Sequence, residues 1–332
     1  MADRPIDVVG IGNAIVDVLA RTDESFLAEQ GLAKGTMTLI DGKDAEELYA
    51  RMGPGVEVSG GSAANTLAGL AALGGHGAFI GKVRNDQLGG IFRHDIRATG
   101  VFFDTPAATD GPPTARCLIF ITPDARRTMG TFLGAAVELG PGDLDAGLIR
   151  DAKVTYLEGY LWDAPAAKAA FLDAARMAHE AGRKVALSLS DPLCVDRHRE
   201  SFRELVRHHV DVLFANEAEI RSLFEVGTFD RALQEVRGRC EVAALTRSAR
   251  GSVILAGEAV HVVDAAPVDH IVDTTGAGDL YAAGFLYGYT QGRGLYHCGR
   301  IGAIAAAEAI SHFGARPETP LGALVAERLN GA

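Results

Sequence analysis

Short apolar runs alternate with longer segments of helical periodicity along most of this chain. The apolar runs are expected as strands at 6–10, 78–81, 154–158, 185–189, 212–214, 242–245, 253–255 and 260–263. The periodic segments are expected as helices at 63–73, 87–99, 164–181, 197–208, 217–224, 231–237, 278–290, 295–311 and 321–329. Helices between apolar strands form βαβ crossovers, so the pattern predicts a three-layer α/β/α sandwich around a mainly parallel, twisted sheet.

Two turn-rich segments with β-forming sequence, 13–59 and 100–122, interrupt this alternation. They are expected to form a small β-sheet lid. Residues 1–12, 60–99 and 123–332 then make up the large domain. Ligands of such sheets bind beyond the carboxyl ends of the strands, so polar residues that follow strands are the candidates for a site.

Composition narrows the class of partner. The formal net charge of −11 argues against nucleic acid or an anionic membrane as the main partner. No stretch approaches the roughly 20 apolar residues of a membrane span, and the N-terminal segment lacks a basic leader. The scattered cysteines form no C-x-x-C pair and indicate reduced thiols. A cytoplasmic protein that acts on small molecules is expected.

The segment Asp-Thr-Thr-Gly-Ala-Gly-Asp at 273–279 carries the strongest chemical signal. Gly276, Ala277 and Gly278 precede an apolar helix, where exposed backbone amides and the helix dipole favour a phosphoryl group. Asp279 follows in the first turn and can accept a hydroxyl proton. An anion hole beside such a base suits phosphate transfer from ATP to an alcohol. A glycine-rich turn capped by Asp279 is the alternative.

Two other segments offer groups for an acceptor. Asn13 and Asp17 follow the first strand and have the hydrogen-bonding groups to hold vicinal hydroxyls. The glycine pair at 60–61 lets backbone approach a ligand, with Asn65 one turn into the next helix. Ordinary turn chemistry at Asn13 and an N-cap role for Ser62 stay open.

Two loops offer groups for ATP. Asn216 and Glu219 follow a strand, where Glu219 can orient water on a phosphate-bridging Mg²⁺, although the spacing also fits a capping box. Thr246 can donate to a phosphate, and Arg247 or Arg250 can supply positive charge, unless the loop is a plain hairpin.

Competing motifs are incomplete. A dinucleotide fingerprint needs glycine at position 15, which is Ile15, and a P-loop needs Ser or Thr where Val83 stands. No G-x-S-x-G elbow is present. A dehydrogenase and a serine hydrolase are therefore disfavoured.

The order of these motifs resembles the ribokinase-like (PfkB) carbohydrate kinase family over about residues 6–329. The resemblance rests on GG-x-x-x-N at 60–65, N-x-x-E at 216–219, T-x-x-x-x-G at 246–251 and DTTGAGD at 273–279. It implies Asp279 as general base and the amides of Gly276, Ala277 and Gly278 as the anion hole. It further implies acceptor contacts from Asp17, Gly60, Gly61 and Asn65, magnesium–phosphate contacts from Asn216 and Glu219, and ATP contacts from Thr246 and Gly251.

Several segments are most similar to the adenosine kinases of this family. IGNAIVD matches their entry motif at Asn13 and Asp17, and Cys117 falls where they place a cysteine on the acceptor-facing sheet. SLSDPLCV, ARRTMGTFLGAA and EGYLW (158–162) are also similar, the last with aromatic residues able to stack on a purine. The implied reaction moves the γ-phosphate of ATP to a primary hydroxyl of adenosine. A sugar kinase for ribose or fructose, and a non-catalytic nucleoside or sugar sensor, are the alternatives.

The resemblance also bears on ions and assembly. It implies Mg²⁺ with ATP, and K⁺ activation is common in the family, for which Asp273 and Ser311 would form the site. Two positions depart from the family pattern: Ser248 replaces a loop glycine and Asp191 replaces a small residue. Both a monomer and a homodimer are compatible with the sequence.

Overall fold

Two β-sheets organise the computed structural model, which describes residues 5–124 and 126–330. The nine-stranded sheet has the order β14-β13-β12-β11-β10-β9-β1-β5-β6. Its strands are β1 (Val8–Ile11), β5 (Gly77–Ile80), β6 (Phe102–Phe103), β9 (Val154–Glu158), β10 (Lys184–Ser188), β11 (Val212–Asn216), β12 (Val242–Thr246), β13 (Ser252–Ala256) and β14 (Ala259–Val263). Only the β12–β13 and β13–β14 pairs are antiparallel, so the sheet is mainly parallel, as predicted.

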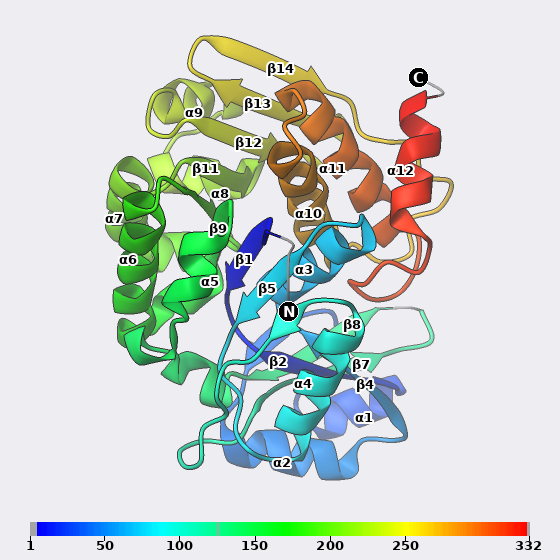
Figure 1. Cartoon of the computed structure of the whole chain (residues 1–332). Coiled ribbons are helices and arrows are strands. Elements are labelled where there is room, and N and C mark those ends of the chain that lie inside the picture. The colour runs from blue at the N-terminus through cyan, green and yellow to red at the C-terminus, as the bar shows by residue number, and fades with distance from the viewer. Residues whose placement is uncertain (1–4, 125, 331–332) are drawn as a thin grey trace.

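Helices cover both faces of this sheet (Figure 1). One face packs against α5 (Ala146–Asp151), α6 (Pro165–Glu180), α7 (Pro192–His209), α8 (Glu217–Phe224) and α9 (Phe229–Val236). The other packs against α3 (Ser62–Ala72), α4 (Gln87–Ala98), α10 (Ala277–Thr290) and α11 (Leu295–Ala309), with α12 (Leu321–Asn330) outside. Strands β1 and β5 are buried at every position, which explains their uninterrupted apolar sequence. The three-layer sandwich is confirmed.

The five-stranded sheet has the order β3-β8-β7-β2-β4. Its strands are β2 (Ile15–Arg21), β3 (Met37–Leu39), β4 (Gly55–Gly60), β7 (Ala115–Ile121) and β8 (Arg127–Phe132). One face packs on the short helices α1 (Glu24–Glu29) and α2 (Gly42–Arg51), and Figure 1 shows this small sheet at one end of the large one. No helix among residues 5–124 and 126–330 is long and apolar enough to cross a membrane.

The sheets divide the chain differently from the expected borders in two places. β8 was expected in the large domain, but it pairs with β7 and belongs to the small sheet. β6 was expected in the lid, but it pairs with β5 at the edge of the large sheet. Both strands lie within a few residues of a border, where the β-forming sequence gives no sign of which sheet a strand joins. Positions 1–4, 125 and 331–332 of the expected ranges lie outside the described residues.

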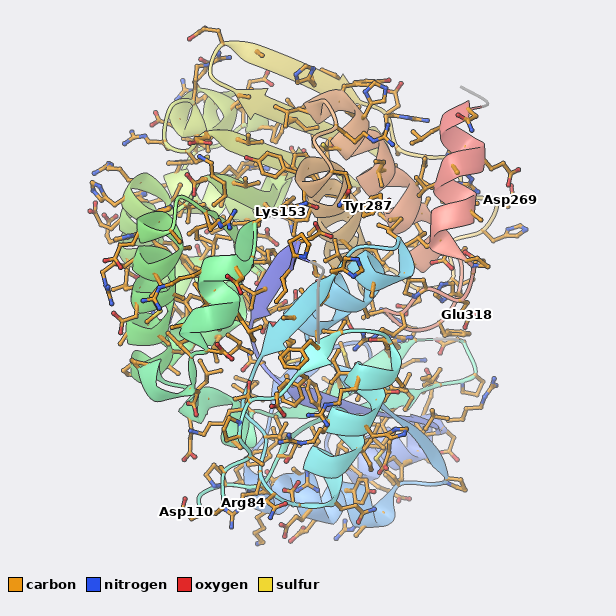
Figure 2. All side chains as sticks on the ribbon, viewed as in Figure 1. Arg84, Asp110, Lys153, Asp269, Tyr287 and Glu318 are labelled. Carbon is orange, nitrogen blue, oxygen red and sulfur yellow. The ribbon has the colours of Figure 1, made fainter. Side chains whose placement is uncertain are left out.

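A partly buried ion pair fixes the amino ends of the central strands to α10. Nζ of Lys153, labelled in Figure 2, donates to Oδ1 of Asp7 at 2.8 Å and to the carbonyl of Thr290 at 3.0 Å. Oδ2 of Asp7 accepts from the amide of His76, directly before β5. The end of α10 is therefore held against β1, β5 and β9, which sets where the start of α10 lies.

Adjacent glycines in α4 provide a matched test of this packing. A Cβ on Gly89 would lie 2.0 Å from the carbonyl oxygen of Arg84, whereas one on Gly90 would meet nothing within 4 Å. We expect Gly90→Ala to stabilise the protein by about 1 kcal/mol through helix propensity. Gly89→Ala should destabilise it by about 2 kcal/mol through overpacking. Thermal unfolding of both variants measures this, and equal shifts would contradict the packing described.

Candidate active site

A cavity of about 590 Å³ lies where the carboxyl edge of the large sheet meets the small sheet. Residues at or just beyond the ends of β1, β9, β10, β11 and β12 line one side, and β2, β3, β7 and β8 line the other. The loop before α10 and the start of α3 complete the wall. The cavity therefore stands where ligands bind in open α/β sheets.

Asp279 lines this cavity and is held there by α3. Its Oδ1 accepts from the hydroxyl of Ser62 at 2.6 Å, and its Oδ2 accepts from the side-chain amide of Asn65 at 3.1 Å. Burial raises the pKa of Asp279, while these two hydrogen bonds and the nearby guanidinium of Arg316 oppose the rise. Asp279 does not cap its helix, since the N-cap is Gly276 and the Asp279 carboxylate bonds to α3 instead.

The turn at 276–278 lines the same cavity through Gly276 and Gly278. Gly276 has φ +77, and a Cβ there would lie 2.4 Å from that of Ala315, so only glycine fits. The amide of Ala277 donates to the carbonyl of Thr274 at 3.3 Å, a long turn hydrogen bond. Within the described part of the chain, the amides of Gly276 and Gly278 make no such bond. The start of α10 thus presents backbone donors to the cavity.

Glu158, at the end of β9, binds the segment that follows β1. Its Oε1 accepts from the side-chain amide of Asn13 at 2.6 Å, and its Oε2 accepts from the backbone amide of Ala63 at 2.8 Å. Glu158 is 1% exposed, and burial raises its pKa to about 7. Oδ1 of Asn13 is buried without a partner among the described residues. Asn13 therefore has an unused acceptor at the cavity.

Asp17 and the glycine pair pack together beside Asn13. A Cβ on Gly60 would lie 2.4 Å from the Asp17 carboxylate, and one on Gly61 would lie 2.2 Å from the carbonyl oxygen of Asn13. Gly61 also has φ +96. Burial raises the pKa of Asp17 to about 7, against the charges of Arg316 and Arg127, with Asp279 adding to the rise. The expected close backbone approach exists, and it brings β4 and α3 against these two polar residues.

Arg316 joins the segments around these carboxylates. It donates to the carbonyl of Ala64 at 3.2 Å, and to the carbonyl and hydroxyl of Ser59 at 2.6 and 2.9 Å. Burial lowers its pKa to about 10, and the nearby charges of Asp95, Asp17 and Asp279 limit the decrease. Arg316 thus supplies a positive charge behind the acidic end of the cavity.

Asn216 and Glu219 line the cavity at the end of β11, and they also form the capping box of α8. The amide of Asn216 donates to Oε2 of Glu219 at 2.8 Å, and the amide of Glu219 donates to Oδ1 of Asn216 at 2.9 Å. Burial raises the pKa of Glu219 to about 7. Each carboxylate oxygen keeps a free lone pair, which suits contact with a hydrated ion rather than direct ligation. No group of three or more His, Cys, Asp or Glu side chains suited to a metal occurs among the described residues.

Only part of the loop after β12 lines the cavity. Thr246 lines it, but Arg247 donates to Oε2 of Glu217 at 3.0 Å and stacks 4.1 Å from the centroid of Phe229. The expectation that Arg247 faces a phosphate therefore finds no support in this conformation. Gly251 has φ +75 and lies against the carbonyl of Val263, which requires glycine. Ser248 adopts φ +53, the left-handed conformation that a glycine would adopt more easily.

The small sheet gives the cavity an apolar wall. Alternate residues of its strands face inward, as pleating requires: Ile15, Met37, Leu39, Cys117, Ile119 and Met129. Thr131 donates to Sγ of Cys117 at 3.3 Å, and burial raises the pKa of Cys117 to about 12. Tyr160 also lines the cavity, but Trp162 is buried in the core against Phe171 and Phe202. Of the aromatic residues expected to meet a purine in 158–162, only Tyr160 is placed to do so.

Asp273 and Ser311, expected at a monovalent-cation site, are engaged by other groups. Asp273 pairs with Arg127, and the hydroxyl of Ser311 donates to the carbonyl of Glu308 at 2.7 Å. Asp191 is the N-cap of α7, accepting from the amides of Leu193 and Cys194. This capping explains the acidic residue at position 191.

Comparison with known proteins identifies the family of this site. Residues 31–321 match the family described as pfkB family carbohydrate kinase. The chain belongs to this family. The kinase is 53% identical to the adenosine kinase from Sinorhizobium meliloti, whose crystal structure aligns over 98% of this chain and 100% of that one with a TM-score of 0.90.

Other relatives carry different names. The crystal structure of a probable sugar kinase from Rhizobium etli CFN 42 is 52% identical, with 98% and 99% coverage and a TM-score of 0.90. The ATP-dependent ribose-1-phosphate kinase of Halopiger xanaduensis is 32% identical over 257 residues, 74% of this chain and 80% of its own. The chain is thus a carbohydrate or nucleoside kinase, and kinases of this family use ATP, generally with Mg²⁺.

The sequence analysis did not identify three residues that contribute to this candidate site. Ser62 was considered only as an N-cap, but the N-cap is Gly61 and the Ser62 hydroxyl binds Asp279. Glu158 was treated only as the last residue of a strand. An acidic residue at the buried C-terminal end of a strand is itself a sign of a functional site. Arg316 lies in a loop far along the sequence, and no local pattern marks it.

Arg316 provides a pH-dependent test. Replacing it with Met removes the charge that restrains the pKa of Asp17 and Asp279, so both should rise further. An opposite charge typically lowers a carboxyl pKa by one unit or more, so we expect the acid limb of kcat/KM to move up by about one unit. Arg316→Lys keeps the charge and should stay near the wild-type profile. An acid limb unchanged in Arg316→Met would contradict the electrostatic role.

Proposed function

We propose that this kinase transfers the γ-phosphate of ATP to the 5′-hydroxyl of adenosine. The apolar wall of the small sheet carries the proposal. A sugar presents hydroxyls on most sides, whereas a nucleoside has a polar ribose and a planar, largely apolar base. The cavity has the same division, with carboxylates and amides at one end and aliphatic and sulfur-containing side chains facing them.

The polar end suits the ribose. Asp17 can accept hydrogen bonds from neighbouring hydroxyls, and Oδ1 of Asn13 has no partner among the described residues. Glu158 holds Asn13 and the start of α3 in place. The Sinorhizobium meliloti relative named adenosine kinase supports this acceptor, while the Rhizobium etli relative keeps a sugar as the second candidate.

Asp279 is the proposed general base. As the 5′-oxygen bonds to the γ-phosphorus, its proton passes to a carboxylate oxygen of Asp279 and the bond to the ADP leaving group breaks. Ser62 and Asn65 orient that carboxylate, and the amides of Gly276 and Gly278 stabilise charge on the phosphoryl oxygens. Asn216 and Glu219 are the residues that would contact the water of an Mg²⁺ ion bound with ATP, and that ion would supply positive charge to the phosphates.

An acceptor panel tests the identity of the substrate. With ATP and Mg²⁺, we expect ADP release with adenosine at a kcat/KM far above that with ribose or fructose. A preference for either sugar would overturn the adenosine assignment but leave the kinase. Binding of adenosine without ADP release from any acceptor would favour the non-catalytic sensor.

A matched pair of variants tests the wall itself. Leu39 and Val56 are exposed apolar residues of the small sheet, 56% and 64% exposed, but only Leu39 lines the cavity. Leu39→Asn should raise KM for adenosine by about tenfold, since part of a leucine contact is lost. Val56→Asn should leave KM unchanged. Equal effects of the two substitutions on KM would argue against contact between the adenine base and this wall.

The Asp279→Asn variant tests the role of Asp279 as general base. This change preserves size but removes the proton acceptor, so kcat should fall by about 10²–10⁴ or more. Adenosine affinity by calorimetry should stay within about threefold, because the ribose contacts lie elsewhere. Asp110→Asn, at an exposed loop position labelled in Figure 2, is the control. Wild-type kcat in Asp279→Asn would refute the assignment.

A further inference from the structure

An arginine of the small sheet ties that sheet to the loop before α10. Arg127 opens β8, and its Nη2 lies 2.5 Å from Oδ2 of Asp273. Its Nη1 donates to the hydroxyl of Thr275 at 3.0 Å. Both side chains of the ion pair are only 8% exposed. The contact is therefore a largely buried ion pair directly before the glycines of the anion hole.

Both carboxylate oxygens of Asp273 are engaged by other groups of the protein. Oδ1 accepts from the amide of Thr275 at 3.0 Å, and Oδ2 accepts from the amide of Gly314 at 3.1 Å besides pairing with Arg127. Cζ of Arg127 also lies 5.8 Å from the ring centroid of Phe313. One guanidinium thus joins β8, the loop before α10 and the turn between α11 and α12.

A monovalent cation does not fit these residues. An ion on Asp273 would share its oxygens with the guanidinium, placing two positive charges beside one carboxylate in a poorly solvated position, where like charges repel strongly. The hydroxyl of the second expected ligand, Ser311, brings no negative charge to balance an ion and donates its proton to the carbonyl of Glu308 in α11. Asp273, the charged residue expected to hold K⁺, is therefore already neutralised by Arg127.

We propose that Arg127 stands in for a monovalent cation, so that this kinase neither binds K⁺ at Asp273 nor needs it. The guanidinium is permanently charged and covalently attached, and it neutralises Asp273 at any salt composition. The order of the anion-hole loop then depends on the position of the small sheet instead of on the ion content of the solution. This inference holds whichever acceptor the kinase uses.

The first test measures the effect of different monovalent cations on the wild-type protein. Thallium(I), a K⁺ mimic with an NMR-active nucleus, reports binding directly, and thermal unfolding reports stability. We expect no saturable Tl⁺ binding, and a Tm that is equal in KCl and in choline chloride of the same concentration. Saturable Tl⁺ binding displaced by K⁺, or a Tm that rises with K⁺ at constant ionic strength, would overturn the proposal.

The second test removes the charge. Arg127→Met leaves Asp273 unneutralised, so a K⁺ ion should now bind there and raise Tm by about 2 °C or more relative to choline. Phosphoryl transfer should fall at least about tenfold in choline and recover in part with K⁺. Arg127→Lys keeps a fixed charge and should remain indifferent to K⁺.

Arg126→Met is the matched control, since Arg126 is the exposed neighbour in the same segment. Its Tm and its rate of phosphoryl transfer should match those of the wild type in KCl and in choline chloride. If Arg127→Met folds and is as indifferent to K⁺ as the wild type, Arg127 does not replace an ion and the proposal fails. If Arg127→Met does not fold, K⁺ dependence of Arg127→Lys would overturn it equally.

Discussion

The arrangement of the site depends on the close contact of two helix starts, those of α3 and α10, around the carboxylate of Asp279. Small residues make this possible. A Cβ on Gly69 of α3 would lie 2.6 Å from Cδ1 of Leu280 and 2.8 Å from Cβ of Ala283 of α10, so a glycine at this position lets the two helices pack closely. On its other side, α10 meets α11 through Gly284 and Gly302, each too close to backbone for a Cβ. Because α10 is fixed between two neighbours, the hydrogen bonds from Ser62 and Asn65 can define one orientation of the base.

The same packing concentrates acids where solvation is poor. Burial raises the pKa of Asp17, Glu158 and Glu219 to about 7, and raises that of Asp279. An acidic side chain whose pKa is raised in the folded state destabilises that state as pH rises through the raised value. These four side chains therefore lower the free energy of unfolding as the pH rises. Their common position at one cavity is the usual mark of a functional site. Arg316 limits the cost by placing one positive charge behind Asp17 and Asp279.

Local sequence patterns predicted the large sheet well because its strands are buried on both faces and its helices have clear ends. The helix at 217–224 was predicted with its observed bounds. The small sheet was predicted only as a region: the polar helices α1 and α2 were missed, and the residues that form β8 were placed in the large domain. At the site, Asp279 and its glycines follow from a local motif. Its partners Ser62 and Arg316 come from segments far away in sequence, and their roles arise only when the chain folds.

The two sheets contribute different parts of the candidate site, and relatives of nearly equal similarity carry the names adenosine kinase and probable sugar kinase. On the proposed mechanism, phosphoryl transfer uses the loop at 273–279, the start of α3 and the ends of the parallel strands, all from the large domain. In the proposed complex, the part of the acceptor beyond the reacting hydroxyl would meet β2, β3, β7 and β8, which form the apolar wall of the cavity. Changes at these positions leave the base, the anion hole and the fold intact. On the proposed function, acceptor choice resides in a handful of wall residues, so overall identity to a relative does not decide it.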